Sequence, residues 1–138
     1  MIIITPKFDK IKMDVYHVDG GALIEPPRYQ FHDAYFSVLD DSGNVIHVNR
    51  SLGNIYSGLA EFYAIKWAVE NIKERPIKIT SDCKVAISWS KKGAKTKKHT
   101  VQPLDLDGVV LEYQHNNLAD QYNSNFICYT EHEAVRES

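Results

Sequence analysis

The sequence predicts an α/β fold, in which one mixed sheet has helices packed on it. Two observations lead to this expectation. The first part of the chain contains three strand-like segments joined by turns, which is typical of an antiparallel meander. The second part alternates helical and strand-like patterns, which favours parallel strands connected by helices. The expected order is strand, strand, strand, helix, strand, helix, strand, helix.

The meander is expected at residues 13–19, 29–39 and 45–49. These segments contain β-branched and aromatic residues in the pattern of strands. Residues 40–44 read Asp-Asp-Ser-Gly-Asn and separate the second segment from the third. This composition predicts a hairpin turn, so the second and third strands should be antiparallel neighbours.

The alternating half begins with a helix near Ser57, a good N-cap residue, because apolar residues recur at helical spacing as far as Ile72. The β-branched run at residues 77–80 predicts a strand, and residues 85–89 begin a second helical pattern. The apolar run at residues 109–111 predicts the last strand, before a final helix. The sheet should therefore have five strands, three antiparallel and then parallel ones.

Length and composition favour one compact domain. With 138 residues, 43% of them hydrophobic, the chain can bury its own core. We expect a single domain over residues 1–138, with its core at about 13–126 and a frayed tail at 129–138. No apolar run could span a membrane and the first residues do not resemble a signal peptide, so a cytoplasmic location is expected. Cys83 and Cys128 are expected to be free thiols, and nothing indicates an obligate protein partner.

The charge distribution limits the ways in which the chain could bind nucleic acid. The net charge is −2 and the pI near 6.3, which argues against a protein that coats nucleic acid by bulk electrostatics. One segment is locally basic, with five lysines: Lys91, Lys92, Lys95, Lys97 and Lys98. Such a cluster could contact several phosphates and make binding salt-dependent, or it could be a solvated basic loop.

Four acidic residues each lie where an apolar run meets a turn or a helix: Asp19, Glu61, Asp82 and Asp120. In open α/β sheets, ligands and metals gather outside the carboxyl ends of the strands, and three of these acids are expected near such an edge. Alone, an acid in such a place is usually a solvated turn residue. Four together would repel one another unless a cation lay between them.

A divalent metal ion is the simplest such cation. Sites rich in carboxylate oxygens suit Mg²⁺ or Mn²⁺. Two such ions about 3.5–4 Å apart can activate a water and stabilise the leaving oxygen in phosphodiester hydrolysis. The acids therefore indicate a nuclease-like site.

The order of the acidic motifs resembles the type 1 ribonuclease H family. That family has an Asp-Gly-Ser-like turn after its first strand, an acid in its first helix, a Thr-Asp-Ser-like turn after its fourth strand, and a final Asn-x-x-Ala-Asp. This chain has Asp19-Gly20-Gly21, Ala60-Glu61 with Ala64, Ser81-Asp82-Cys83 and Asn116-Asn117-Leu118-Ala119-Asp120. The resemblance covers residues 13–126 and implies a ribonuclease H-like fold.

The resemblance also implies roles for the four acids. Asp19 would bridge two metal ions, Glu61 and Asp82 would complete one side, and Asp120 would hold the second ion. Candidate substrate-binding residues are Gly20, Ser57 and Asn116, together with the five lysines.

This chain departs from the family in three places. Gly21 and Cys83 replace the usual Ser of two turns, and the basic helix and handle loop of many bacterial members are missing. Tyr56, Ser57 and Gly58 stand where the family has DNA-gripping Asn and Thr residues. The family's mobile His, when present, lies well before the last Asp, so His115 is either an auxiliary group or a surface residue.

The function expected from these observations is metal-dependent hydrolysis of the RNA strand of an RNA/DNA hybrid by an endoribonuclease. Three alternatives remain open. The chain could be a nuclease of the same fold that acts on other RNA, a catalytically silent nucleic-acid-binding module, or a detached domain of a reverse transcriptase. Retention of all four acids argues against the silent module.

Overall fold

The computed structural model describes residues 13–25, 30–53, 55–95 and 100–124. Its main sheet has five strands in the order β3-β2-β1-β4-β7. Their bounds are β1 Asp14–Glu25, β2 Gln30–Asp40, β3 Val45–Gly53, β4 Ile77–Ser81 and β7 Val109–Tyr113. β1, β2 and β3 pair antiparallel, whereas β4 pairs parallel with both β1 and β7. The predicted fold class is confirmed.

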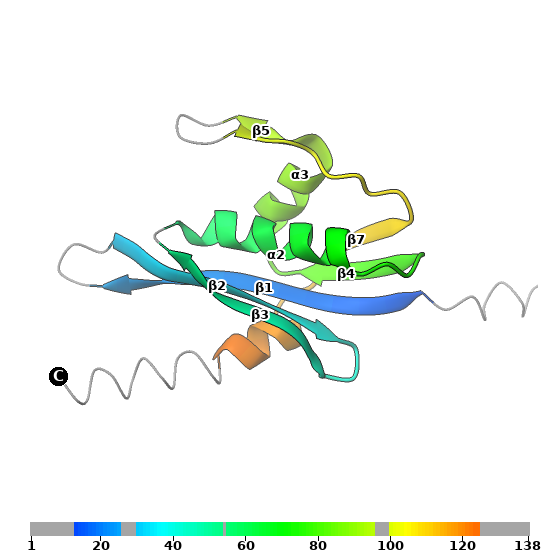
Figure 1. The fold of residues 1–138 in the computed structure, drawn as a ribbon, viewed down its shortest axis with the longest axis horizontal. Helices are drawn as coiled ribbons and strands as arrows, with labels where there is room; N and C mark the ends of the chain where they lie inside the picture. Colours follow the sequence, from blue (N-terminus) through cyan, green and yellow to red (C-terminus); the bar gives the residue numbers. More distant parts are fainter. Residues whose placement is uncertain (1–12, 26–29, 54, 96–99, 125–138) are drawn as a thin grey trace, which may run out of the picture.

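Helices lie on both sides of this sheet (Figure 1). Helices α2, Ser57–Asn71, and α3, Lys84–Lys92, lie on one side, and the helical residues 118–124 lie on the other. α2 begins where the sequence predicts, but its N-cap is Tyr56, without a side-chain cap bond, and not Ser57.

The hydrophobic core lies between the sheet and the pair α2 and α3. Ile65 in the middle of α2 and Val18, Val38 and Ile79 of the sheet are fully buried. Each such side chain contributes about 1.5–3 kcal/mol relative to an exposed one. The apolar face of α2 therefore fixes this helix, and with it Glu61, over the middle of the sheet.

β1 is longer than the sequence predicts. A turn was expected after Asp19, because two glycines follow, but β1 continues through them to Glu25 with an irregular register between Gly21 and Leu23. The glycines make room for neighbours instead. A Cβ on Gly20 would lie 2.6 Å from the backbone carbon of Ala60, and one on Gly21 would lie 2.6 Å from the Tyr35 hydroxyl. The expected end of the first strand is therefore wrong, and Asp19 lies within a strand.

The basic segment after α3 forms a second, small sheet. β5, Ala94–Lys95, pairs antiparallel with β6, Thr100–Val101. Sequence patterns did not predict this hairpin. Lys95 is exposed on β5, whereas Lys97 and Lys98 lie outside the described residues. Cys83 is a free cysteine, and Cys128 and the expected tail at 129–138 also lie outside them.

None of the helices that the structure describes is long and apolar enough to cross a membrane.

Candidate metal centre

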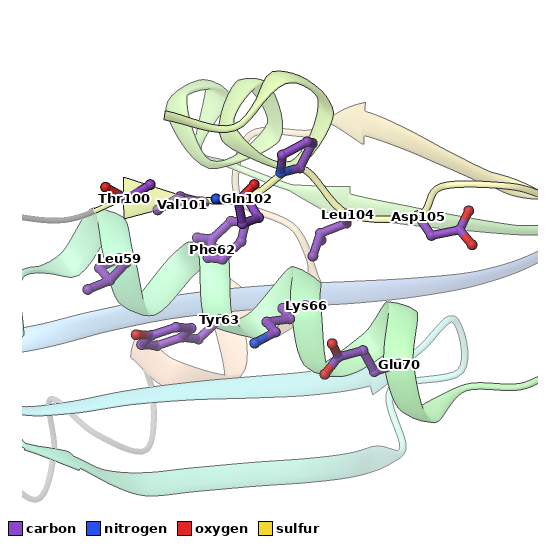
Figure 2. Close-up of a pocket in the computed structure, with 11 residues that line it drawn as sticks. Leu59, Phe62, Tyr63, Lys66, Glu70, Thr100, Val101, Gln102, Leu104 and Asp105 are labelled. Carbon is purple, nitrogen blue, oxygen red and sulfur yellow. The ribbon is translucent and has the colours of Figure 1, made fainter. Parts of the chain in front are cut away.

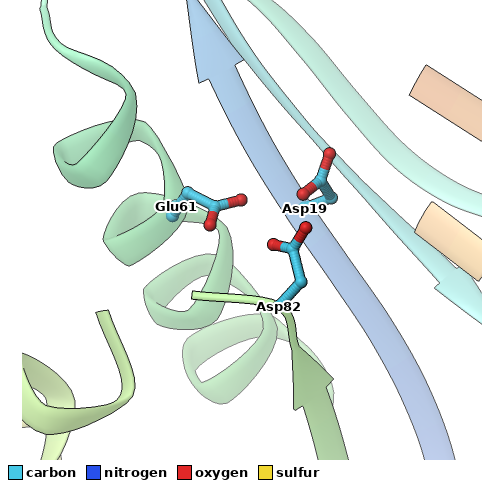
Figure 3. Close-up of side chains that lie close together, drawn as sticks. All are labelled: Asp19, Glu61 and Asp82. Carbon is cyan, nitrogen blue, oxygen red and sulfur yellow. The ribbon is translucent and has the colours of Figure 1, made fainter. Parts of the chain in front are cut away.

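Three acidic side chains from three elements point toward one another (Figure 3). Asp19 lies on β1, Glu61 on the second turn of α2, and Asp82 directly after the end of β4. One carboxylate oxygen of each lies within 4.8 Å of the corresponding oxygens of the other two. Asp19 and Glu61 are 5% and 7% exposed, and Asp82 is half-buried. The structure thus brings together three of the four predicted acids.

Close packing of β1 against α2 places two of these carboxylates. Gly20 has no side chain, so the backbone of α2 at Ala60 can approach the strand. The Gly20 N–H donates to the Glu61 carboxylate at 2.6 Å. A larger residue at position 20 would push α2 away and move Glu61 from Asp19.

Burial raises the pKa of both Asp19 and Glu61. Desolvation is the largest cause for each, because the charged form loses its contact with water. The hydrogen bond to Glu61 and its charge raise the pKa of Asp19 further, and the charge of Asp82 raises both. Bonds from the Asp19 side chain and the Gly20 N–H act in the opposite direction on Glu61. Without a cation, this pair therefore retains a proton at neutral pH.

Asp120 approaches the same place from the opposite side of the sheet, on the helical residues 118–124. It is half-buried, and its pKa is raised by burial and by Asp82 and lowered by His115. Asp120 does not belong to the group of three oxygens, but it borders the same hollow of about 250 Å³. We call this hollow the acidic hollow; it is lined by Asp19, Gly20, Tyr35, Ser57, Gly58, Glu61, Asp82, Cys83 and Asp120.

Comparison of sequences identifies no relative: no protein-family model and no curated protein matches the chain. Solved structures do match. LC11-RNase H1 in complex with an RNA/DNA hybrid superposes with a TM-score of 0.54 at 14% identity, over 78% of this chain and 89% of that chain. The fold is ribonuclease H-like. The PFV RNase H domain matches with a TM-score of 0.55 at 16% identity, over 78% of this chain and 90% of that one. The foamy viral protease-reverse transcriptase in complex with an RNA/DNA hybrid matches with a TM-score of 0.52 at 16% identity, over 81% of this chain but 18% of that much longer one.

The predicted substrate-binding residues lie in different parts of the structure. Gly20 and Ser57 line the acidic hollow. Lys91 and Lys92 are exposed at the end of α3. Asn116 is exposed in a turn with a positive φ of 55°, and its carbonyl accepts a bond from Gln121.

His115 is exposed next to Asn116, and it is close enough to Asp120 to lower the pKa of that carboxyl. Both expectations for His115, an auxiliary group or a surface residue, therefore stay predictions. The structure assigns no hydrogen bond to the His115 ring within the described part of the chain.

Two buried asparagines around Asp120 were missed by sequence reasoning. Asn117 is 1% exposed and caps the last helix, because its Oδ1 accepts a bond from the Asp120 N–H at 2.9 Å. Asn123 is 3% exposed and donates to Asp19 Oδ2 at 2.9 Å. An asparagine three residues before Asp120 is an N-cap signal that could have identified the first; the second could have been suspected only from its spacing, about one helical turn after Asp120.

The donor set of the acidic hollow fits a divalent metal ion. Carboxylate oxygens are the ligands that Mg²⁺ and Mn²⁺ prefer. No lysine or arginine is among the described residues that line the hollow, so its carboxylates lack an internal counter-charge. Buried like charges without a counter-ion are unfavourable, which is the condition that a bound cation relieves. Asp19, Glu61 and Asp82 could hold such an ion, with Asp120 at its edge.

A second hollow, of about 570 Å³, lies between α2 and residues 100–105 (Figure 2). We call it the α2 groove. Lys66 and Glu70 line it from α2, and Gln102 and Asp105 line it from the segment above. None of the four predicted acids borders it. Its charges are mixed, and it is separate from the carboxylate cluster.

Proposed function

We propose that this protein is a metal-dependent endoribonuclease that hydrolyses the RNA strand of RNA/DNA hybrids with two divalent ions. The observation that supports this most is the convergence of Asp19, Glu61 and Asp82, with their oxygens within 4.8 Å of one another, on a ribonuclease H-like sheet. Phosphodiester hydrolysis needs clustered negative ligands of this kind, because the reaction develops charge on both the attacking and the leaving oxygen.

The residues of the acidic hollow have separate tasks in this proposal. Asp19 would help to hold both ions, with Glu61 and Asp82 completing one side and Asp120 the other. Bound there, the ions would supply activation of the attacking water and stabilisation of the leaving 3′ oxygen. The Gly20 N–H keeps the Glu61 carboxylate aimed into the hollow through its bond of 2.6 Å. Asn123 restrains Asp19 in the same way at 2.9 Å.

The choice of a hybrid as substrate is supported by two considerations. LC11-RNase H1 and the foamy viral protease-reverse transcriptase were each solved with an RNA/DNA hybrid, and both share this fold. Ser57 lines the hollow, and its hydroxyl could contact a ribose 2′-hydroxyl, the group that distinguishes RNA from DNA. The exposed Lys91, Lys92 and Lys95 could contact phosphates beside it.

A substrate panel tests the proposal. End-labelled RNA/DNA hybrid, RNA duplex, single-stranded RNA and DNA duplex would be incubated with Mg²⁺, with Mn²⁺ and with EDTA. We expect cleavage of the RNA strand of the hybrid only, and only with metal. The rate of hybrid cleavage should fall by more than about 100-fold in the Asp82→Asn variant. A proposed metal ligand is lost there, and this costs more than the loss of a residue behind a ligand.

Asp107→Asn is a matched control, because Asp107 is an exposed loop acid. It should cleave like the wild type. Cleavage of duplex or single-stranded RNA in place of the hybrid would favour a nuclease of the same fold with another substrate. Absence of any cleavage, with hybrid still bound, would favour the silent binding module.

A further inference from the structure

A buried histidine two residues before Asp19 contacts both a surface carboxylate and a buried hydroxyl. His17 on β1 is 3% exposed. Its Nε2 lies 2.8 Å from Oδ1 of Asp41, a residue of the turn between β2 and β3 whose side chain is 68% exposed. Its Nδ1 lies 2.7 Å from the hydroxyl of Thr80, which is buried on β4. The ring therefore connects an exposed carboxylate to a buried hydroxyl.

The connection continues from Thr80 to the last helix. Thr80 Oγ1 accepts a bond of 3.0 Å from Asn117 Nδ2. The same Nδ2 lies 3.1 Å from the carbonyl oxygens of Val18 and Thr80, so the side chain of Asn117 is fixed between β1 and β4. Asn117 Oδ1 in turn accepts the bond from the Asp120 N–H at 2.9 Å. Four consecutive hydrogen bonds thus join Asp41 to the backbone of the fourth acid.

The bonds form a chain with one consistent direction. In the tautomer that carries its proton on Nε2, His17 donates to the Asp41 carboxylate, and its Nδ1 accepts from the Thr80 hydroxyl. The oxygen of that hydroxyl accepts from the Asn117 amide, whose carbonyl oxygen accepts from Asp120. The Asn117 amide offers two protons to three acceptors, Thr80 Oγ1 and the carbonyl oxygens of Val18 and Thr80, so two of these acceptors share a proton.

Asp120 has a particular need for such support. Asp19 and Glu61 are placed by close packing of β1 against α2 at Gly20. Asp120 is half-buried, lies on a short helical segment on the other side of the sheet, and is outside the tight group of three oxygens. Its backbone is held at the third helical position by the Asn117 cap.

We propose that Asp41, His17, Thr80 and Asn117 are positioning residues that set the place of Asp120 in the acidic hollow. This inference rests on the proposed function and extends it to residues that contact neither metal nor substrate. Hydrogen-bond partners behind metal ligands typically change metal affinity or activity by about 10–100-fold when they are removed. This series of hydrogen bonds acts on Asp120 alone, so its loss affects turnover and the metal requirement and leaves hybrid binding intact.

Thr80 offers the sharpest test. Thr80→Val keeps the shape and removes the hydroxyl, while Thr80→Ser keeps the hydroxyl and removes a methyl group. Ser90→Ala is a matched control, because Ser90 is also fully buried, and its hydroxyl donates to the Ala86 carbonyl at 2.8 Å, within α3. In Thr80→Val the amide of Asn117 keeps two carbonyl partners, but His17 Nδ1 loses its partner, so the melting temperature of each variant is measured first.

Four quantities would be measured for each variant: kcat and KM with hybrid, the Mg²⁺ concentration for half-maximal rate, and the ¹⁵N–¹H resonance of Asp120. For Thr80→Val we expect kcat to fall about tenfold and the Mg²⁺ requirement to rise, with KM within about twofold. Its Asp120 amide should shift and exchange faster with solvent. Thr80→Ser should restore kcat to within about threefold of wild type, and Ser90→Ala should match wild type.

Several results would overturn the inference: wild-type kcat and Mg²⁺ requirement in Thr80→Val, equal losses in Thr80→Ser, or the same losses in Ser90→Ala. If Thr80→Val does not fold, Asp41→Ala at the exposed end should lower kcat about threefold with KM unchanged, and a wild-type kcat there would count against the chain. If the wild type cleaves nothing, the proposed function fails. In that case Mg²⁺ calorimetry and the Asp120 amide still test the positioning, because neither needs turnover.

Discussion

The acidic hollow and the α2 groove both border α2, yet they differ in size and in charge. The groove is the larger, at about 570 Å³ against about 250 Å³. It places Lys66 together with Glu70 and Asp105, so its acids have a basic neighbour. The hollow gathers four carboxyl groups without a basic residue among its described lining. Unbalanced buried charge is therefore the better guide to the chemistry of this molecule than the volume of a cavity.

The largest expected effect comes from comparing one substitution in the acidic hollow with one in the α2 groove, both on α2. Glu61→Gln keeps the shape of the side chain and an oxygen that can accept from the Gly20 N–H, but it removes the negative charge. Hybrid cleavage should fall by more than about 100-fold, because a metal ligand is weakened rather than a residue behind it. Glu70→Gln, on the same helix but in the groove, should leave the single-turnover rate at the wild-type value. Equal rates for both variants would remove Glu61 from the proposed centre.

The next effect concerns stability. The folded-state pKa values of Asp19 and Glu61 are raised, chiefly by burial, so the folded protein binds protons more tightly than the unfolded chain. Their contribution to stability is fully present below the unfolded pKa of about 4 and is lost as pH rises through the higher folded values. In EDTA, the melting temperature should therefore fall from acidic to alkaline pH.

Mg²⁺ should reverse this loss, with the largest increase in melting temperature at alkaline pH, because metal ligands must be deprotonated. Asp19→Asn should raise the free energy of unfolding in EDTA at alkaline pH by about 1 kcal/mol or more and abolish the response to Mg²⁺. Asp107→Asn serves as the control, since Asp107 is exposed. A flat pH profile in EDTA would show that the carboxylates are not strained in the way that their burial implies.

The parts of the fold that the sequence predicts are those with strong local signals. The helical spacing from Ser57 to Ile72 and the short run at residues 77–80 place α2 and β4 within a residue or two of their observed bounds. These elements position Glu61 and Asp82, so much of the candidate site was predictable. The length of β1 was not, because two consecutive glycines give the signal of a turn. Their actual roles depend on distant neighbours, because Gly20 makes room for Ala60 of α2 and Gly21 makes room for Tyr35 of β2.

The buried polar residues behind the acids also could not be predicted from the sequence. His17, Asn117 and Asn123 are each at most 3% exposed, and apart from the N-cap position of Asn117 and the spacing of Asn123 after Asp120, nothing in their sequence neighbourhoods separates them from solvated polar residues. Their partners are distant in the chain: Asn117 lies 37 residues from Thr80, and Asn123 lies 104 residues from Asp19. Only the folded sheet brings these groups together. The residues that hold the acids in place could therefore be identified only from the structure.

A smaller effect is expected from the basic segment beside the α2 groove. Lys91 and Lys92 at the end of α3 and Lys95 on β5 are exposed. Changing all three to Gln should weaken hybrid binding and make the slope of log K against log salt shallower by about 0.7–0.9 for each lost phosphate contact. The cleavage rate at saturating hybrid should change little, because the metal ligands are intact. An unchanged salt slope would indicate that these lysines are only a solvated surface.

The smallest effect is expected from Lys66 inside the α2 groove. Lys66→Gln removes one positive charge, as each lysine change in the basic segment does, but from a place where Glu70 and Asp105 already oppose it. Phosphate contacts need a net positive potential, so this variant should change neither the affinity for hybrid nor its salt slope beyond about twofold in binding. Fluorescence anisotropy with labelled hybrid at several salt concentrations measures both. A loss of affinity comparable to that of the triple lysine variant would show that nucleic acid enters the α2 groove. The groove would then be part of the substrate path.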